Sequence, residues 1–136
     1  MLHLPREELG TLRDWVRSGY PNETCGLLLG RQENGLVEVR RVDRARNLNR
    51  ERARDRYQLD PLDYLESERR ASAEGMEVVG IWHSHPDHPA RPSESDRSAA
   101  YEGVSYLIVS VSAQGVGELR SWRLRDEVFE EEELRA

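Results

Sequence analysis

Three of the four histidines of this chain lie within six residues, in the segment Trp82-His83-Ser84-His85-Pro86-Asp87-His88. His83 and His85 are two positions apart at the end of a predicted strand, where alternate side chains project from the same face. Both imidazoles can therefore bind one metal ion. Asp96 lies one helical turn beyond Ser93, and if the intervening loop folds back, its carboxylate completes the site. Three protein ligands that leave one position open are typical of catalytic zinc.

A hydrolytic metal site also needs a base, and Glu23 is the candidate because it directly precedes a strand that we expect to be buried. A water bound to zinc has a pKa of about 7 instead of about 15.7, and is therefore a nucleophile at neutral pH. An ionised carboxylate beside an apolar layer is costly without a partner. Burial would raise the pKa of Glu23 toward the pH at which an acid–base group works. Ser93 is expected to donate a hydrogen bond to the oxyanion of the tetrahedral intermediate.

These residues resemble the motif of the JAMM (MPN-plus) metalloproteases, which here reads Glu23, His83-x-His85, seven residues, and Ser93-x-x-Asp96. The flanking segments Glu-Thr-Cys-Gly-Leu-Leu-Leu-Gly and Gly-Ile-Trp-His-Ser-His-Pro resemble the short prokaryotic branch of this family. The resemblance covers at least residues 23–96. It implies a cytidine-deaminase-like fold and a zinc hydrolase with one catalytic ion.

The resemblance also implies a class of substrate. Members of the family act on peptide or isopeptide bonds, commonly after the C-terminal glycines of ubiquitin or a ubiquitin-like protein. Some short prokaryotic relatives act on sulfur-carrier proteins and release a C-terminal amino acid during cysteine synthesis. A chain of 136 residues has little room for the insertions of the eukaryotic deubiquitinases. We therefore expect a minimal peptidase.

Two other functions remain open at this point. Two histidines and one carboxylate also bind iron in non-haem oxygenases, although those enzymes need no upstream glutamate and usually have all-β folds. A scaffold or binding module on the same fold is the non-enzymatic alternative, but such relatives typically lose metal ligands. Zinc deaminases are excluded, because they need Cys-x-x-Cys and this chain has only Cys25.

A run of arginines begins within the second predicted strand and continues beyond it, at positions 40, 41, 44, 46, 50, 52, 54 and 56. One interpretation is a solvated surface whose charge is partly offset by neighbouring acids. The functional hypothesis is that Arg50, Arg52 and Arg54 hold an extended substrate tail or an acidic face of the carrier protein. Cys25 is predicted to be a small core residue. The alternative hypothesis is that oxidation of its thiol, or binding of a metal by it, modulates activity. His88 is expected to be an exposed loop residue.

The composition excludes several classes of function. All 20 basic residues are arginine, which excludes a Schiff-base lysine and a P-loop. The net charge of −6 argues against a nucleic-acid-binding protein. No apolar stretch approaches the ~20 residues of a membrane span. With one cysteine and no apparent signal peptide, the cytoplasm is the expected compartment. The oligomeric state, monomer or homodimer, is left open.

The hydrophobic pattern predicts an α/β fold, in which helices flank a mixed β-sheet. The length predicts a single domain over 1–136, and the resemblance implies that it is a JAB1/MPN domain. The predicted helices cover 5–18, 61–75 and 93–101. The predicted strands cover 24–29, 36–42, 57–59, 76–83, 104–111 and 116–124, and an Asn34-Gly35 turn joins the first two. The acidic end, about 126–136, is predicted to be a solvated tail or a frayed helix.

Overall fold

A computed structural model describes residues 1–136. Its elements are, in chain order, β1 (Leu2–His3), α1 (Arg6–Gly19), β2 (Cys25–Glu33), β3 (Leu36–Ala45), α2 (Pro61–Ala73), β4 (Glu77–Pro86), α3 (Glu94–Ala99), β5 (Ser105–Ser112), β6 (Gly115–Arg125), β7 (Val128–Glu132) and β8 (Leu134–Arg135). The strands form one sheet in the order β7-β6-β5-β4-β2-β3-β1-β8. β4 and β5 are parallel, whereas β2 is antiparallel to both β3 and β4. The predicted α/β fold with a mixed sheet is confirmed.

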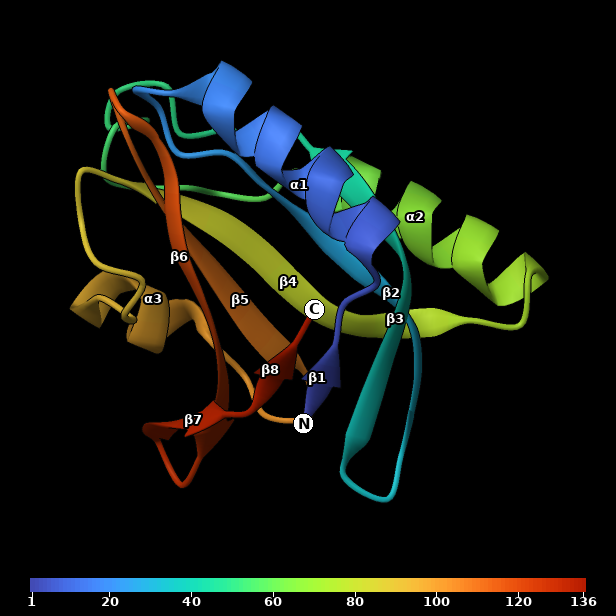
Figure 1. The fold of residues 1–136 in the computed structure, drawn as a ribbon. Helices are drawn as coiled ribbons and strands as arrows, with labels where there is room; N and C mark the ends of the chain where they lie inside the picture. Colours follow the sequence, from blue (N-terminus) through green and yellow to red (C-terminus); the bar gives the residue numbers. More distant parts are fainter.

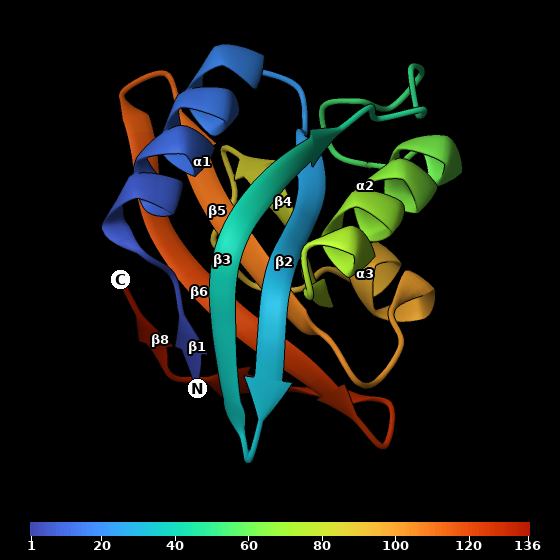
Figure 2. The ribbon, with the colours of Figure 1, turned by 90° about the vertical axis from the view of Figure 1, so that its right-hand side faces the viewer.

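The two long helices cover opposite faces of the sheet (Figure 1, Figure 2). α1 buries Leu12 and Val16 in a core with Trp82 of β4, and Trp15 stacks on Trp82 with ring centroids 6.0 Å apart. α2 buries Ala71 in a second core on the other face. No helix is both long and apolar enough to cross a membrane.

β2 lies between these two cores, as its continuous apolar run predicts. Leu28 packs into the core beneath α1, whereas Leu27 and Leu29 pack into the core beneath α2, because successive side chains of a strand alternate between the faces. At Gly26 a Cβ atom would lie 1.9 Å from the main-chain oxygen of Asp43. Only glycine therefore allows β3 to approach this closely beside Trp82.

The predicted turn and helix signals are found where the sequence places them. Asn34 and Gly35 have φ angles of 50° and 81° in the β2–β3 hairpin, as a tight turn of this kind requires. Asp60 caps α2, because its Oδ1 accepts a hydrogen bond from the Leu62 N–H at 2.9 Å. Gly75, with φ 73°, follows the end of that helix.

Several predicted boundaries differ from the structure. β2 and β3 continue to Glu33 and Ala45, beyond their predicted ends at 29 and 42. β4 continues through both histidines to Pro86, beyond the predicted end at 83. α3 ends at Ala99 instead of about Tyr101. The predicted strand at 57–59 is reduced to one isolated bridge, between Asn47 and Leu59.

The prediction of a tail or a frayed helix at the acidic end is wrong, because this segment forms β7 and β8. Glu130, Glu131 and Glu133 are nevertheless exposed to solvent. β7 pairs with β6, and β8 pairs with β1. The acidic side chains have local partners: Glu131 forms an ion pair with Arg120, and Glu132 accepts a hydrogen bond from Ser121. These contacts and the strand hydrogen bonds offset the repulsion between neighbouring glutamates. The sequence shows the run of like charges but not the partners on β6, and so the repulsion was overestimated.

Candidate metal centre

The end of β4 and the start of α3 bring three potential ligands together. The Nε2 atoms of His83 and His85 lie 3.1 Å apart, and Asp96 Oδ2 lies 3.2 Å from the first and 3.0 Å from the second. Both histidines are buried. The two imidazoles thus project from the same face of β4, as their spacing predicts.

The three atoms fit one metal ion. Zinc binds histidine nitrogen and carboxylate oxygen at about 2.0–2.2 Å, and two ligands of a tetrahedron at that radius are about 3.3–3.6 Å apart. The separations of 3.0–3.2 Å are close to this value. Two nitrogen ligands and one oxygen ligand suit zinc and also non-haem iron.

The surroundings prepare both imidazoles as ligands. His85 Nδ1 donates a hydrogen bond to the main-chain oxygen of Pro89 at 2.8 Å, and such a bond orients the ring so that Nε2 faces the site. Burial lowers the pKa of His83, which keeps its ring in the neutral form that binds metals. The ring of Tyr57 stacks on His83, with a centroid distance of 4.4 Å.

A capping box at the start of α3 fixes Asp96. Its Oδ2 accepts a hydrogen bond from the Ser93 N–H at 2.9 Å, and its own N–H donates to Ser93 Oγ at 3.0 Å. Burial alone would raise the pKa of Asp96, but hydrogen bonds with His83 and His85 hold it well below its usual value. The carboxylate is therefore ionised. Ser93 Oγ accepts in this box, so its proton is available for another acceptor.

Glu23 lies just before β2 and is buried, with 6% of its surface exposed. Its Oε1 atom has no hydrogen-bond partner. Burial raises the pKa of Glu23 to about 8. The residue after Glu23 is hydrogen-bonded to β4, which carries the two histidines. The Thr24 N–H donates to the Oγ atom of Ser84, the residue between His83 and His85, at 2.8 Å. An unpartnered buried carboxyl oxygen near three metal ligands fits a site that holds a metal and a water.

Glu23, His85 and Ser93 line one cavity of about 380 Å³. The other lining residues come from the loop before α2 and from the proline-rich loop, and they are Asp55, Arg56, His88, Pro89 and Arg91. His88 is exposed, as predicted. The candidate base, one ligand and the candidate oxyanion donor thus face the same space.

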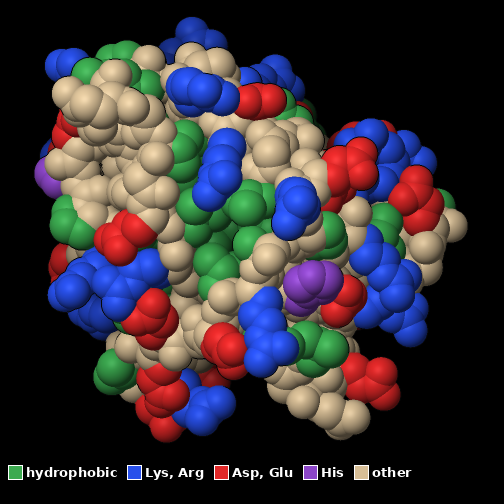
Figure 3. Space-filling view, in the orientation of Figure 1, with side chains coloured by type: hydrophobic (Ala, Val, Ile, Leu, Met, Phe, Trp, Pro, Cys, Tyr) green, Lys and Arg blue, Asp and Glu red, His purple; other side chains and the backbone are tan.

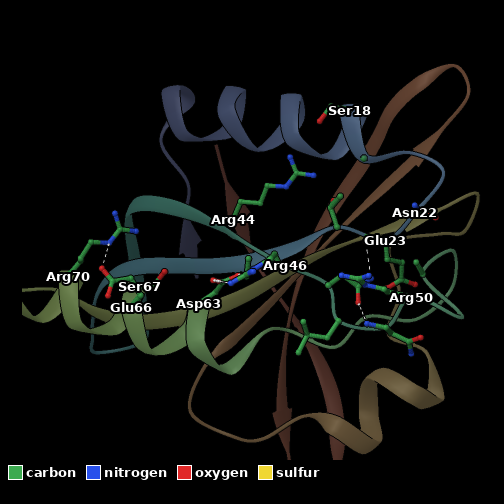
Figure 4. A pocket seen from close by; sticks show the side chains of 17 residues that line it. Ser18, Asn22, Glu23, Arg44, Arg46, Arg50, Asp63, Glu66, Ser67 and Arg70 are labelled. Carbon is green, nitrogen blue, oxygen red and sulfur yellow. Dashed lines mark hydrogen bonds and ion pairs between the residues drawn. The ribbon is translucent and has the colours of Figure 1, made fainter.

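The three arginines proposed to hold the substrate do not gather in one place. Arg50 lines a larger cavity of about 980 Å³ between the ends of α1 and α2, which Glu23 also borders (Figure 4). Arg52 forms an ion pair with Asp55. Arg52 and Arg54 both line another cavity, near Pro86, which Arg50 does not reach. Arginine and acidic side chains also alternate over the face in Figure 3, so no broad basic surface is present there.

Cys25 is fully buried, and its Sγ lies 3.8 Å from the main-chain oxygen of Ala45. Burial raises the pKa of the thiol to about 12. Oxidation and metal capture both proceed through the thiolate. The structure therefore favours the prediction of a small core residue over the regulatory hypothesis.

Two residues that contact this site had no signal in the sequence. Tyr57 was assigned to a short strand, and its stacking on His83 depends on how the loop before α2 folds back. Asn47 stands among arginines as an ordinary loop residue, yet its side chain donates to the main-chain oxygens of Glu23 and Arg56. Only the three-dimensional contacts identify them.

Comparison with known proteins gives a consistent picture. Residues 5–125 match the family of prokaryotic homologs of the JAB domain. A desampylase from Pyrococcus furiosus is 34% identical over 76% of this chain and 68% of its own length. A probable TtuB-protein conjugate cleaving protease from Thermus thermophilus is 34% identical over 79% of this chain and 69% of its own length. A CysO-cysteine peptidase from Mycobacterium tuberculosis is 33% identical over 86% of this chain and 78% of its own length.

Solved structures agree with these matches. A solution structure from Desulfitobacterium hafniense superposes with a TM-score of 0.88 at 32% identity, and covers 98% of this chain and 91% of its own. The crystal structure of a JAB1/MPN domain protein from Archaeoglobus fulgidus has a TM-score of 0.58 at 21% identity, over 98% of this chain and 95% of its own. The second likeness concerns the fold alone.

Proposed function

The chain belongs to the family of prokaryotic JAB-domain proteins, and from this premise we propose that it is a zinc-dependent peptidase. Its substrate is an amide bond after the C-terminal glycines of a ubiquitin-like or sulfur-carrier protein. The observation that carries the proposal concerns Glu23. Its buried Oε1 atom has no hydrogen-bond partner, and the residue lines the same cavity as His85 and Ser93.

His83, His85 and Asp96 would hold the metal. When bound, Zn²⁺ lowers the pKa of a coordinated water to about 7 and polarises the carbonyl of the scissile bond. Burial favours the neutral form of His83, and the Asp96 carboxylate is ionised, as metal ligands need. Burial alone would lower the pKa of His85, but its contacts with Asp96 and Pro89 raise it, so this imidazole gives up a proton when the metal binds. We assign the ion as zinc because zinc is a Lewis acid without redox chemistry and two histidines with one carboxylate are a common catalytic zinc site.

The remaining chemistry falls to Glu23 and Ser93. Glu23 accepts a proton from the attacking water and passes it to the nitrogen of the leaving amine. A pKa of about 8 lies close to neutral pH, and this suits a group that must both accept and release a proton. The Ser93 hydroxyl donates to the oxyanion that forms on the carbonyl carbon. The capping box with Asp96 fixes its position.

The names of the relatives support the substrate class. One is a TtuB-protein conjugate cleaving protease and another is a CysO-cysteine peptidase, so both cleave a group attached to a partner protein. The cavity of about 380 Å³ is at the small end of ligand sites, which span about 300–1,000 Å³. Such a space accepts a narrow glycine tail and a small leaving group.

Mass spectrometry of candidate carrier proteins, extended by one amino acid beyond their terminal glycines, tests the proposal. We expect cleavage directly after the last glycine, loss of cleavage on chelation, and recovery with Zn²⁺. Glu23→Gln should be inactive, whereas Glu68→Gln, on the exposed surface of α2, should keep full activity. Cleavage that survives both chelation and Glu23→Gln contradicts the proposal. Metal analysis of protein purified without added metal separates zinc from iron.

A further inference from the structure

Two arginines line the cavity that contains the proposed catalytic residues. Arg56 reaches it from the loop before α2, and Arg91 reaches it from the proline-rich loop between β4 and α3. Arg91 is exposed and forms no ion pair in the structure, unlike Arg52 or Arg97, each of which pairs with an acid on its own segment. A cation without a partner at an active-site cavity is free to bind an anionic group of the substrate.

The main chain beside Arg91 is held firmly in place. Ala90 is fully buried. Its main-chain oxygen accepts a hydrogen bond from Trp122 Nε1 at 3.0 Å, and its N–H donates to Glu118 at 3.3 Å. Pro92 follows and fixes its own φ angle. Arg91 therefore projects from an anchored segment, two residues before Ser93.

The one acid among the loop residues of the cavity is already neutralised. Asp55 forms ion pairs with Arg52 and with Arg56, the latter at 3.7 Å. Arg91 is therefore the one arginine of the cavity wall that has no ion-pair partner.

We propose that Arg91, assisted by Arg56, binds the α-carboxylate of the amino acid that is released. This inference rests on the proposed peptidase function and specifies its substrate class. When the bond after the last glycine breaks, the leaving group is an amine. A guanidinium beside it can bind a carboxylate one carbon away through two parallel hydrogen bonds.

This subsite distinguishes two classes of conjugate. A single amino acid attached after the terminal glycine carries a free carboxylate next to the scissile bond. A lysine side chain in an isopeptide does not, because its own carboxyl group is part of a peptide bond and lies several bonds away. The subsite therefore favours release of a C-terminal amino acid over removal of the carrier from a protein lysine.

Two carrier substrates that differ in one group test the inference. Both end in Gly-Gly followed by one alanine, and one has a free carboxylate whereas the other has a carboxamide. Wild type should cleave the acid with a kcat/KM at least about tenfold higher, since a charge-assisted hydrogen bond has about that effect. Arg91→Gln should remove this preference by lowering kcat/KM for the acid alone. Arg91→Lys should retain part of it, and Arg13→Gln, an exposed arginine of α1, should retain all of it.

Binding of the product gives a readout that does not depend on turnover. Titration of the protein with free L-alanine and with L-alaninamide, followed by NMR, should show tighter binding of the acid, lost in Arg91→Gln. Equal cleavage of acid and amide by wild type would overturn the carboxylate subsite and leave the peptidase function intact. If neither carrier is cleaved, the peptidase function fails, and the titration still decides whether the carboxylate subsite exists: equal binding of the two ligands overturns it.

Discussion

The side-chain amide of Asn47 donates a hydrogen bond to the main-chain oxygen of Glu23 at 3.2 Å and another to the main-chain oxygen of Arg56 at 3.1 Å. Its amide oxygen accepts from the N–H groups of Asn49 at 3.0 Å and Gln58 at 2.9 Å. One side chain thus joins the proposed base to the loop that forms a wall of the cavity. Asn47 makes no contact with the metal ligands, and so its role is to position the segment that carries Glu23.

Replacement of Asn47 by alanine should therefore affect both stability and turnover. The change leaves several part-buried main-chain groups without these partners, which costs about 1–3 kcal/mol of the free energy of unfolding. It also loosens the segment that fixes Glu23, so kcat should fall more than KM rises. Urea unfolding and steady-state kinetics measure the two effects. Asn49→Ala removes one hydrogen bond within the same loop and is the control. A stable Asn47→Ala protein with normal kcat would contradict this role.

The buried carboxyl group of Glu23 should make the stability of the metal-free protein depend on pH. Burial raises its pKa from 4.5 to about 8 in the folded chain. As the pH rises through this window, the unfolded chain ionises first, so the free energy of unfolding falls. At about 1.4 kcal/mol for each pKa unit, the loss reaches roughly 3–5 kcal/mol.

Glu23→Gln removes this titration. We therefore expect the metal-free variant to gain stability over wild type between pH 5 and about pH 8, and to be similar to it at the acidic end. Urea unfolding of both proteins in chelator, followed by tryptophan fluorescence, gives the difference at each pH. Glu68→Gln, which is exposed, should follow the wild-type curve. Parallel curves for wild type and Glu23→Gln would exclude a raised pKa.

The sequence predicts the parts of this site that depend on local geometry. His83 and His85 share a face because a strand has a period of two residues, and Ser93 and Asp96 meet because a helix start favours a capping box. Turn and cap residues such as Asn34 likewise fix local conformation. These arguments need no knowledge of distant segments.

The features that sequence analysis missed depend on contacts between distant segments. Tyr57 stacks on His83, 26 positions later in the chain, only because the arginine-rich loop folds back over β4. The acidic end forms strands because arginine and serine side chains of β6 face its glutamates. Pairing of this kind cannot be read from residue types along one segment.

Asp96→Asn should weaken metal binding without unfolding α3. Asparagine can still accept the hydrogen bond from the Ser93 N–H, so the capping box survives, but the site loses its anionic ligand. Wild type should bind one Zn²⁺ and gain thermal stability, since a ligand at a hundredfold excess over its Kd stabilises by about 2.7 kcal/mol. The variant should show little of this gain.

Metal content by mass spectrometry and thermal unfolding with and without Zn²⁺ measure these effects. Glu94→Gln changes an exposed acid of the same helix and should bind the ion as wild type does. Equal stabilisation of wild type and Asp96→Asn would place the metal elsewhere.

Tyr57 should support the metal site through its ring and not through its hydroxyl group. The ring lies almost parallel to the imidazole of His83, at an interplanar angle of 23° and a centroid distance of 4.4 Å. Tyr57→Phe keeps this contact, and so we expect unchanged zinc affinity. Tyr57→Ala removes an aromatic pair of about 0.5–1.5 kcal/mol and frees the imidazole to rotate. Its zinc affinity should fall about tenfold or more, as when other supporting groups of metal ligands are lost. Competition with a chromogenic chelator measures both affinities, and an equal loss in Tyr57→Phe would assign the effect to the hydroxyl group instead.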